Sequence, residues 1–364
     1  IIKVNYRRER YSYTFDYGYD DKAVTADTCY EGTINVPENV ARDGYIFGGW
    51  SLDGKEAVKV NTVMGKDDIV YHALWTPVTY TVHFDGNSEY AEGEMEDISL
   101  TYDEAVTLPD NKFTRENYVF GGWSLTKAGE VRYTDSESVK NISKVDGSTV
   151  TLYAVWIPEE YKISYENLYD GVSTNAASYN IESETIILKA AVRTGYVFEG
   201  WYDNAGLTGD KVDRIEHGSI GNRTFYADWS PAKDTRYRVE HYLQQLDGSY
   251  VLDRTDELTG VTEDIVTPQT HEYAGFTAPE QRTLEITADG NAVLRYDYTR
   301  NTYTLTFDAT EGTLEGNDTI TALYGADITP PSAYREGYGF AGWYDGDVRF
   351  DVRTMPSKDM KLTA

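Results

Sequence analysis

Short stretches of alternating hydrophobic and polar residues recur along the whole chain. Tyrosine, valine, isoleucine, phenylalanine or tryptophan occupies every second position in segments such as residues 11–16, 80–85, 161–166 and 303–308. Glycine, asparagine and aspartate bound these segments. Alternation with a period of two is typical of half-buried strands, and apolar residues at helical spacing are nearly absent. The pattern predicts a mainly β protein.

One short core sequence returns four times, at residues 43–50, 116–123, 194–201 and 336–343. It carries a tyrosine, a phenylalanine, a glycine and a tryptophan at fixed positions. After the first three copies comes a closing strand that ends in Trp75, Trp156 or Trp229. One residue intervenes and a proline follows. A fixed period of about 75 residues indicates tandem modules, each large enough to be a small domain.

The repeated aromatic and glycine residues are the predicted structural core, because large aromatics compensate for the small core of a short module. They are Tyr45, Phe47, Gly49, Trp50 and Trp75 in the first copy, Tyr118, Phe120, Gly122, Trp123 and Trp156 in the second, Tyr196, Phe198, Gly200, Trp201 and Trp229 in the third, and Tyr338, Phe340, Gly342 and Trp343 in the fourth. Simple alternation places Tyr45 and Phe47 on one face of their strand, and Ile46 and Trp50 on the other. Recurrence of the second glycine suggests that a neighbouring backbone or aromatic ring approaches closely there.

The residue before each repeated tyrosine is Gly44, Asn117, Gly195 or Gly337. Glycine and asparagine tolerate a left-handed backbone, so we predict a positive φ at this position. The stretch over residues 37–42 has room for one short helical turn. We therefore expect a small α+β module, with a short helix on one face of its sheet.

The repeats divide the chain into modules at residues 11–76, 77–157, 158–230 and 301–364, the last of them truncated at its C-terminus. Residues 231–300 form a different unit, which turns at Asp247-Gly248 and closes with an alternating segment. Residues 1–10 are similar to that closing segment, and we interpret them as the last strand of a truncated upstream unit. We expect an extended array, like beads on a string, in which the prolines limit the freedom of the linkers.

The motifs Tyr-x-x-x-Phe-Asp, Gly-Tyr-x-Phe-x-Gly-Trp and Tyr-Ala-x-Trp resemble the Listeria-Bacteroides repeat, also called the internalin B-repeat. The resemblance covers residues 11–76, 79–157, 161–230 and 302–364. The intervening unit resembles the mucin-binding (MucBP-like) domain, through Tyr237-x-Val239-x-His241-Tyr242, Asp247-Gly248, Gly275-Phe276 and Tyr296-x-Tyr298. These resemblances imply β-grasp-like modules in a secreted or wall-attached surface protein of a Gram-positive-type bacterium. Family members serve as stalk or adhesion modules.

The amino-acid composition argues against several classes of binding partner. A net charge of -28 over 364 residues argues against nucleic acid, anionic membrane surfaces and heparin-like glycans, which all require clustered lysine and arginine. No apolar run is long enough for membrane insertion. The single cysteine, Cys29, excludes an internal disulfide framework.

Groups that could carry chemistry are few. The histidines are His72, His83, His217, His241 and His271, and none has the sequence spacing of metal ligands. No nucleophile elbow or phosphate-binding loop is present, so we predict no catalytic residue, no metal site, no cofactor and no enzyme activity. The acidic turn at residues 16–21 could offer oxygens to calcium, but its spacing is not that of an EF-hand, which favours a solvated turn.

The leading hypothesis is a non-enzymatic extracellular array that projects a head domain from the cell wall, with the other modules of the same chain as its partners. The first alternative is direct binding of a mucin-type glycan or a host protein, chiefly by residues 231–300. Exposed tyrosines suit such contacts, and the candidates are Tyr242, Tyr250, Tyr273, Tyr296 and Tyr298. Alternating tyrosines can equally fill a core. The second alternative is a set of accessory modules of a large secreted carbohydrate-active enzyme.

Overall fold

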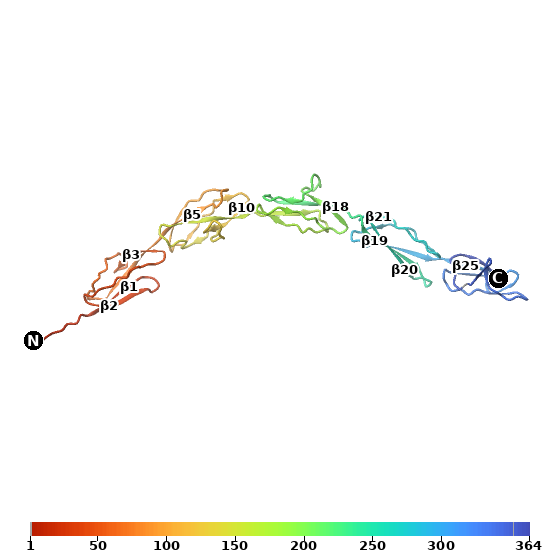
Figure 1. The fold of residues 1–364 in the computed structure, drawn as a ribbon, viewed down its shortest axis with the longest axis horizontal. Coiled ribbons are helices and arrows are strands. Elements are labelled where there is room, and N and C mark those ends of the chain that lie inside the picture. The colour runs from red at the N-terminus through yellow and green to blue at the C-terminus, as the bar shows by residue number, and fades with distance from the viewer. Residues whose placement is uncertain (1, 352) are drawn as a thin grey trace. The chain divides into compact units, whose positions relative to one another are not determined.

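The computed structural model describes residues 2–351 and 353–364, and every regular element in these residues is a β-strand (Figure 1). The chain falls into two compact units. The first comprises Ile1–Tyr161, Asn180–Ser183 and Gly218–Ile220, and the second Lys162–Tyr179, Glu184–His217 and Gly221–Ala364. The mainly β class predicted from the sequence is confirmed.

The first repeat module folds into a four-stranded mixed sheet. Its strands are β1 (Arg10–Asp16), β2 (Ala23–Cys29), β3 (Tyr45–Ser51) and β4 (Ile69–Pro77), in the order β2-β1-β4-β3. The central pair, β1 and β4, is parallel, and both outer pairs are antiparallel. Alternation in β1 buries Tyr13 and Phe15 against Trp50 and Tyr71, which closes the core on one face of the sheet.

The same strand order recurs in every later module. The second has β7-β5-β12-β10, from β5 (Thr79–Asp85), β7 (Ile98–Thr101), β10 (Tyr118–Ser124) and β12 (Thr149–Pro158), and β6 (Ala91–Glu92) and β9 (Thr114–Arg115) extend its edge. The third has β14-β13-β18-β16, from β13 (Tyr161–Glu166), β14 (Ser178–Tyr179), β16 (Tyr196–Tyr202) and β18 (Arg223–Pro231). The fourth has β27-β25-β31-β29-β30, from β25 (Thr302–Asp308), β27 (Thr319–Leu323), β29 (Trp343–Asp345), β30 (Val348–Phe350) and β31 (Met360–Thr363).

The intervening unit is built in the same way although its sequence differs. Its sheet has the order β20-β19-β24-β22, from β19 (Thr235–Gln244), β20 (Tyr250–Gly260), β22 (Phe276–Thr277) and β24 (Ala292–Arg300). The central pair, β19 and β24, is again parallel. The repeats and the intervening unit therefore share one sheet topology.

Loops, and not a helix, cover the packed face of each sheet. They pair into the ladders β8 (Val106–Thr107) with β11 (Ser138–Val139), β15 (Ile186–Ile187) with β17 (Arg214–Ile215), and β21 (Ile265–Val266) with β23 (Leu284–Glu285). Single bridges, Thr33 with Val63 and Asp327 with Thr354, replace these ladders in the first and fourth modules. The fourth module adds the pair β26 (Thr313–Glu315) and β28 (Ser332–Tyr334).

The prediction of a short helix over residues 37–42 is wrong. Asn39 there has φ 56°, a left-handed value that a right-handed helical turn does not admit. The core layer that the helix was expected to supply comes from the β8–β11 ladder and the residues beside it, since Leu108 and Val139 belong to the same core cluster as Trp123. The modules are therefore β throughout their described residues.

A β-bulge corrects the predicted faces of the repeated strand. The pairing of β3 with β4 shifts register between Phe47 and Gly49, and Gly49 has φ 114°. The extra residue turns Trp50 to the same face as Phe47, with ring centroids 5.4 Å apart. The second and third copies shift at the same place, with φ 135° at Gly122 and 153° at Gly200. The glycine thus supplies the backbone conformation of the bulge.

Two further predictions fail where a strand has no neighbour to pair with. Among the described residues of the predicted N-terminal strand, residues 2–9 form no strand. In the fourth copy Tyr338 and Phe340 are 67% and 42% exposed and are not core residues. Their counterparts in the first copy pair with Pro77 and Trp75, and the sequence ends at Ala364, before the equivalent positions.

Replacing Gly122 by alanine tests the role of the bulge. A Cβ there would lie 2.6 Å from the Tyr133 carbonyl oxygen and would also impose strain at φ 135°. We expect Gly122→Ala to destabilise β10 and β12 by about 2–4 kcal/mol. The control is Gly147→Ala, which has φ 67° and open space around the new Cβ, and should cost only about 1 kcal/mol. Peptide-resolved hydrogen exchange of the whole chain measures both, and equal losses of protection would contradict the close-approach account.

Candidate functional site at the module junctions

Adjacent modules are joined almost without a linker. Strand β4 ends at Pro77 and β5 begins at Thr79, so that only the buried Val78 lies between them. At the end of the intervening unit β24 ends at Arg300, and β25 begins two residues later. The prolines assigned to linkers are the last residues of strands β4, β12 and β18. Each junction is therefore part of the paired structure.

The backbone of the linking residue is hydrogen-bonded on both sides. Its N–H donates to the carbonyl of the positive-φ residue in the preceding module: Val78 to Gly44 at 3.0 Å, Ala232 to Gly195 at 2.9 Å, and Asn301 to Gly275 at 2.9 Å. Its carbonyl accepts an N–H from the following module: from Tyr102 at 3.0 Å, Thr262 at 2.9 Å, and Tyr324 at 2.8 Å, respectively. In the first unit, Glu159 likewise donates to the Asn117 carbonyl at 2.9 Å.

Three of the four residues predicted to have positive φ stand at these junctions, and the fourth, Gly337, lies in the last repeat. The φ values are 75° at Gly44, 62° at Asn117, 78° at Gly195 and 85° at Gly337. A Cβ on Gly44 would lie 2.3 Å from the ring of Tyr102, and one on Gly195 would lie 2.6 Å from the Ala288 carbonyl oxygen. Two of these glycines therefore serve the turn and also leave room for the following module.

The repeated tyrosine adds a charge-assisted hydrogen bond across the junctions that follow the first three repeat modules. Tyr45 Oη donates to Asp103 Oδ2 at 2.6 Å, and the guanidinium of Arg42 lies 3.7 Å from the centroid of the tyrosine ring. The hydrogen bond from Tyr45, with smaller effects of Asn141 and Lys140, holds the pKa of Asp103 at about 2. The same pairing joins Tyr118 to Glu182 within the first unit and Tyr196 to Glu263 within the second.

Sequence reasoning missed these acidic partners. Asp103, Glu182 and Glu263 lie in turns, where acidic residues are common for their local hydrogen bonds. A signal exists, because an acidic residue follows the second strand at a similar place in each of these modules. Only the juxtaposition of two modules shows what that residue binds.

The five tyrosines proposed as ligand contacts do not form one surface. Tyr296 and Tyr298 are 0% exposed and belong to the core of the intervening unit, so their proposed role as ligand contacts is wrong. Tyr273 packs edge-on against Tyr298, and burial raises the pKa of Tyr273 to about 12. Tyr242 is half-buried beneath the guanidinium of Arg295, 3.9 Å from its ring centroid, and Tyr250 is half-buried at the start of β20.

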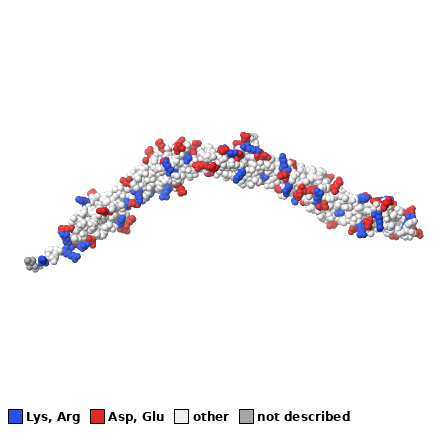
Figure 2. Space-filling view, in the orientation of Figure 1, with Lys and Arg blue, Asp and Glu red and all other residues white. Residues whose placement is uncertain are grey.

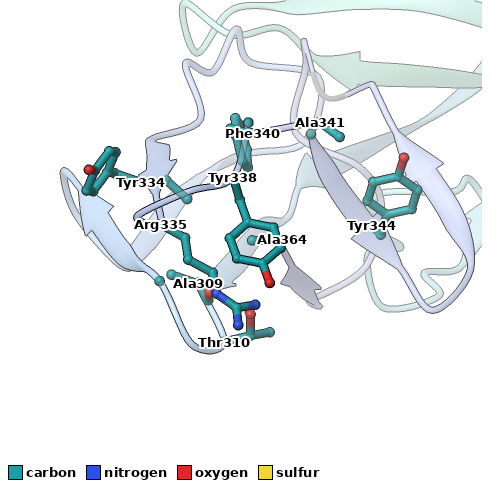
Figure 3. Close-up of a pocket in the computed structure, with 13 residues that line it drawn as sticks. Ala309, Thr310, Tyr334, Arg335, Tyr338, Phe340, Ala341, Tyr344 and Ala364 are labelled. Carbon is teal, nitrogen blue, oxygen red and sulfur yellow. The ribbon is translucent and has the colours of Figure 1, made fainter.

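A pocket in the fourth module is explained by the packing of the other copies (Figure 3). Tyr338, Phe340 and Ala309 line it. In the first three modules the closing tryptophan fills this place and donates from Nε1 to a carbonyl: Trp75 to Tyr17 at 2.7 Å, Trp156 to Gly86 at 2.8 Å, and Trp229 to Asn167 at 2.9 Å. Ala309 is the counterpart of those carbonyl residues. The pocket therefore matches the site of an aromatic side chain of the fold.

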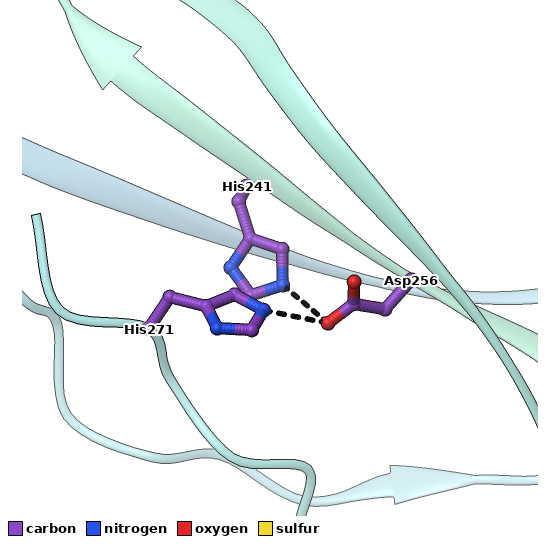
Figure 4. A group of neighbouring side chains, drawn as sticks. All are labelled: His241, Asp256 and His271. Carbon is purple, nitrogen blue, oxygen red and sulfur yellow. Dashed lines mark hydrogen bonds and ion pairs between the residues drawn. The ribbon is translucent and has the colours of Figure 1, made fainter.

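In the intervening unit, three side chains that are far apart in the sequence lie close together: His241, Asp256 and His271 (Figure 4). His241 lies on β19, Asp256 on β20 and His271 in the loop before β22. Their ligand atoms lie within 4.8 Å of one another. Burial, with a smaller effect of His271, lowers the pKa of His241. Although burial opposes it, hydrogen bonds from Arg254 and His271 hold the pKa of Asp256 below its ordinary value.

In the acidic turn at residues 16–21, which was considered for calcium, Asp16 is hydrogen-bonded to neighbouring protein groups. Asp16 Oδ1 accepts the N–H of Gly18 at 2.8 Å, and its Oδ2 lies 3.0 Å from His72 Nδ1. Asp20 and Asp21 have positive φ and are exposed. These contacts are those of a solvated turn that ends a strand.

The recurring sheet and the recurring junction define a tandem-repeat protein built from small β modules. The chain belongs to the Listeria-Bacteroides repeat domain family, which matches residues 11–73, 80–155, 161–228 and 303–364. The resemblance of these repeats seen in the sequence is confirmed.

The chain spans only part of the length of the proteins that it resembles. A protein of Evansella cellulosilytica named "Putative membrane protein" is 27% identical over 230 residues, which are 60% of this chain and 33% of that protein. Internalin H of Listeria monocytogenes is 25% identical over 146 residues, 39% of this chain and 25% of that protein. A solved structure titled "The Bacillus anthracis TIE protein" matches 84% of this chain and 52% of its own at 10% identity, with a TM-score of only 0.18. Within the described residues no helix could span a membrane.

Replacing Tyr45 by phenylalanine tests the junction hydrogen bond. The pKa of Asp103 is depressed in the fold, so its stabilising effect is present above its ordinary pKa of 3.8 and is lost as the pH falls toward about 2. Without the phenolic donor we expect the pKa of Asp103 to rise from about 2 toward 3.8. Carboxylate NMR titration measures it. As the control, Tyr90→Phe removes an exposed tyrosine of the second module and should leave Asp103 unchanged. An unchanged Asp103 in Tyr45→Phe would refute the assignment.

Proposed function

We propose that the chain is a non-enzymatic spacer region of a bacterial surface protein, which projects a head domain from the cell wall. The observation that carries this proposal is the recurring junction. The linking residue is hydrogen-bonded to the modules before and after it. A Cβ on Gly44 or Gly195 would collide with a residue of the following module. Neighbouring modules joined in this way hold a defined orientation, which a spacer requires.

The family and the charge distribution support the same role. Listeria-Bacteroides repeats occur in surface proteins such as internalins, and one of the relatives is an internalin. On the face shown in Figure 2, acidic and basic side chains are interspersed over every part of the chain. With a net charge of -28, such a surface favours solubility and repulsion between modules. We infer a secreted or wall-attached location in a Gram-positive-type bacterium.

We further infer that residues 231–300 are a MucBP-like module and that all the modules are helix-free relatives of the β-grasp fold. The shared strand order supports this inference, because the mixed sheet with a central parallel pair occurs in the repeats and in the intervening unit alike. The loop ladders then take the place of a covering helix.

Direct binding of a mucin-type glycan or a host protein is the second candidate function. It rests on the edge strand β20, where the half-buried Tyr250 precedes the exposed Val251 and Leu252. An exposed edge can accept a strand of a partner. A third function, as accessory modules of a secreted carbohydrate-active enzyme, is compatible with the same junctions.

Small-angle scattering of the whole chain tests the spacer. A single globule of this length would have a radius of gyration of about 21 Å. We expect a clearly larger value, because the buried residues form separate core clusters and a spacer keeps its modules apart. A value near 21 Å would contradict the proposal.

Replacing Gly195 by alanine tests the junction itself. The new Cβ would lie 2.6 Å from the backbone of Ala288, and we expect a cost of about 1–3 kcal/mol that is relieved by separation of the two modules. Gly209→Ala, with φ 85° and open space, is the matched control. Spin labels at the exposed Thr224 and Glu257, in a Cys29→Ser background, report the distance distribution. It should broaden only in Gly195→Ala; equal distributions in both variants would argue against a fixed junction.

A further inference from the structure

We propose that His241, Asp256 and His271 form a binding site for a divalent transition metal of the zinc type. The site lies within the intervening unit, and it is independent of the proposed spacer role. Its ligands are two imidazole nitrogens and one carboxylate oxygen, a set that suits Zn²⁺ and its neighbours in the first transition row. Three protein ligands leave a fourth position for water.

The three ligand atoms already converge (Figure 4). His241 Nε2 lies 3.4 Å from Asp256 Oδ2, and His271 Nε2 lies 2.7 Å from the same oxygen. Ligands about 2.0–2.1 Å from a tetrahedral zinc are about 3.3 Å apart. The first separation matches this value, and the second requires a small outward movement of His271. That residue lies in a loop and its side chain is 34% exposed, so it has room to move.

An unpartnered nitrogen points into the site. His241 is 0% exposed, and its Nε2 has no hydrogen-bond partner. A buried polar atom without a partner costs free energy, and few such atoms occur in folded proteins. A metal ion bound between the three residues would give this nitrogen its missing partner.

Neighbouring groups orient the ligands as outer residues do in known metal sites. His241 Nδ1 lies 2.9 Å from Tyr298 Oη, which also accepts the backbone N–H of His271 at 2.7 Å. When His241 Nδ1 carries the proton and donates it to Tyr298, Nε2 presents its lone pair to the site. Arg254 Nε donates to Asp256 Oδ1 at 2.6 Å, so Oδ2 is the oxygen that faces the two imidazole rings.

The bound ion would fasten a loop to the sheet. Its ligands come from β19, from β20 and from the loop that precedes β22. Without an ion, the contacts among these ligand groups are the hydrogen bond from His271 Nε2 to Asp256 Oδ2 and the approach of His241 Nε2 to the same oxygen at 3.4 Å. Access is from the side of His271, because His241 is enclosed and the Asp256 side chain is only 19% exposed.

Titration of the whole chain with Zn²⁺ tests the site. The protein carries Cys29→Ser, which removes the one thiol that could compete. We expect one equivalent to bind by calorimetry, and histidine side-chain NMR to shift at His241 and His271. Co²⁺ should give the strong visible absorption of a tetrahedral ion. His271→Asn should weaken binding more than about 100-fold, since even the loss of an outer partner costs about 10–100-fold.

The matched control is His83→Asn. His83 also pairs with a carboxylate, Asp97 at 2.7 Å, but the described residues give it no third ligand, so its loss should leave zinc binding unchanged. Binding with unaltered affinity in His271→Asn, or no binding at millimolar Zn²⁺, would overturn the proposal. If His271→Asn does not fold, NMR of the unsubstituted histidines decides: shifts at other histidines only would equally overturn it.

Discussion

The bulge in the repeated strand is the constraint on which the modules depend. It allows Phe47 and Trp50 to lie on one face, and the tilted packing of Trp50 against Phe15, at 4.7 Å between ring centroids, closes the core. A module of this size with no helix has few other ways to bury enough apolar surface. The same strand begins directly after Gly44, whose carbonyl anchors the linking residue. One strand therefore carries the junction at its start and the core tryptophan near its end.

Two glycine conformations make this double role possible. At the start of the strand, positive φ turns the chain and leaves room for Tyr102 of the following module. Gly49, four residues after Tyr45, forms the bulge. A side chain at either position would distort the junction or the core. The repeated motif therefore determines the backbone conformation as well as the packing of the core.

The sequence predicted what depends on local chemistry and repetition. The four copies, the strands and the positive φ of Gly44 follow from residue type and period. What it missed depends on neighbours in space. Alternation placed Trp50 on the wrong face because a bulge adds one residue, and a helix was expected where loop ladders close the core. Asp103 and the group around Asp256 come from strands and turns far apart in the chain, so no spacing rule connects them.

The intervening unit shows that the junction does not depend on the repeat sequence. Gly275, with φ 82°, accepts the N–H of Asn301 just as Gly44 accepts that of Val78, and Tyr324 covers it as Tyr102 covers Gly44. Here Phe276 replaces the junction tyrosine, and Arg300 lies 4.8 Å from its ring centroid. The hydroxyl and its acidic partner are therefore an addition to a junction that the backbone already forms. Because the backbone contacts are shared, units of either sequence can follow one another in an array, and each can differ in what its remaining surface binds.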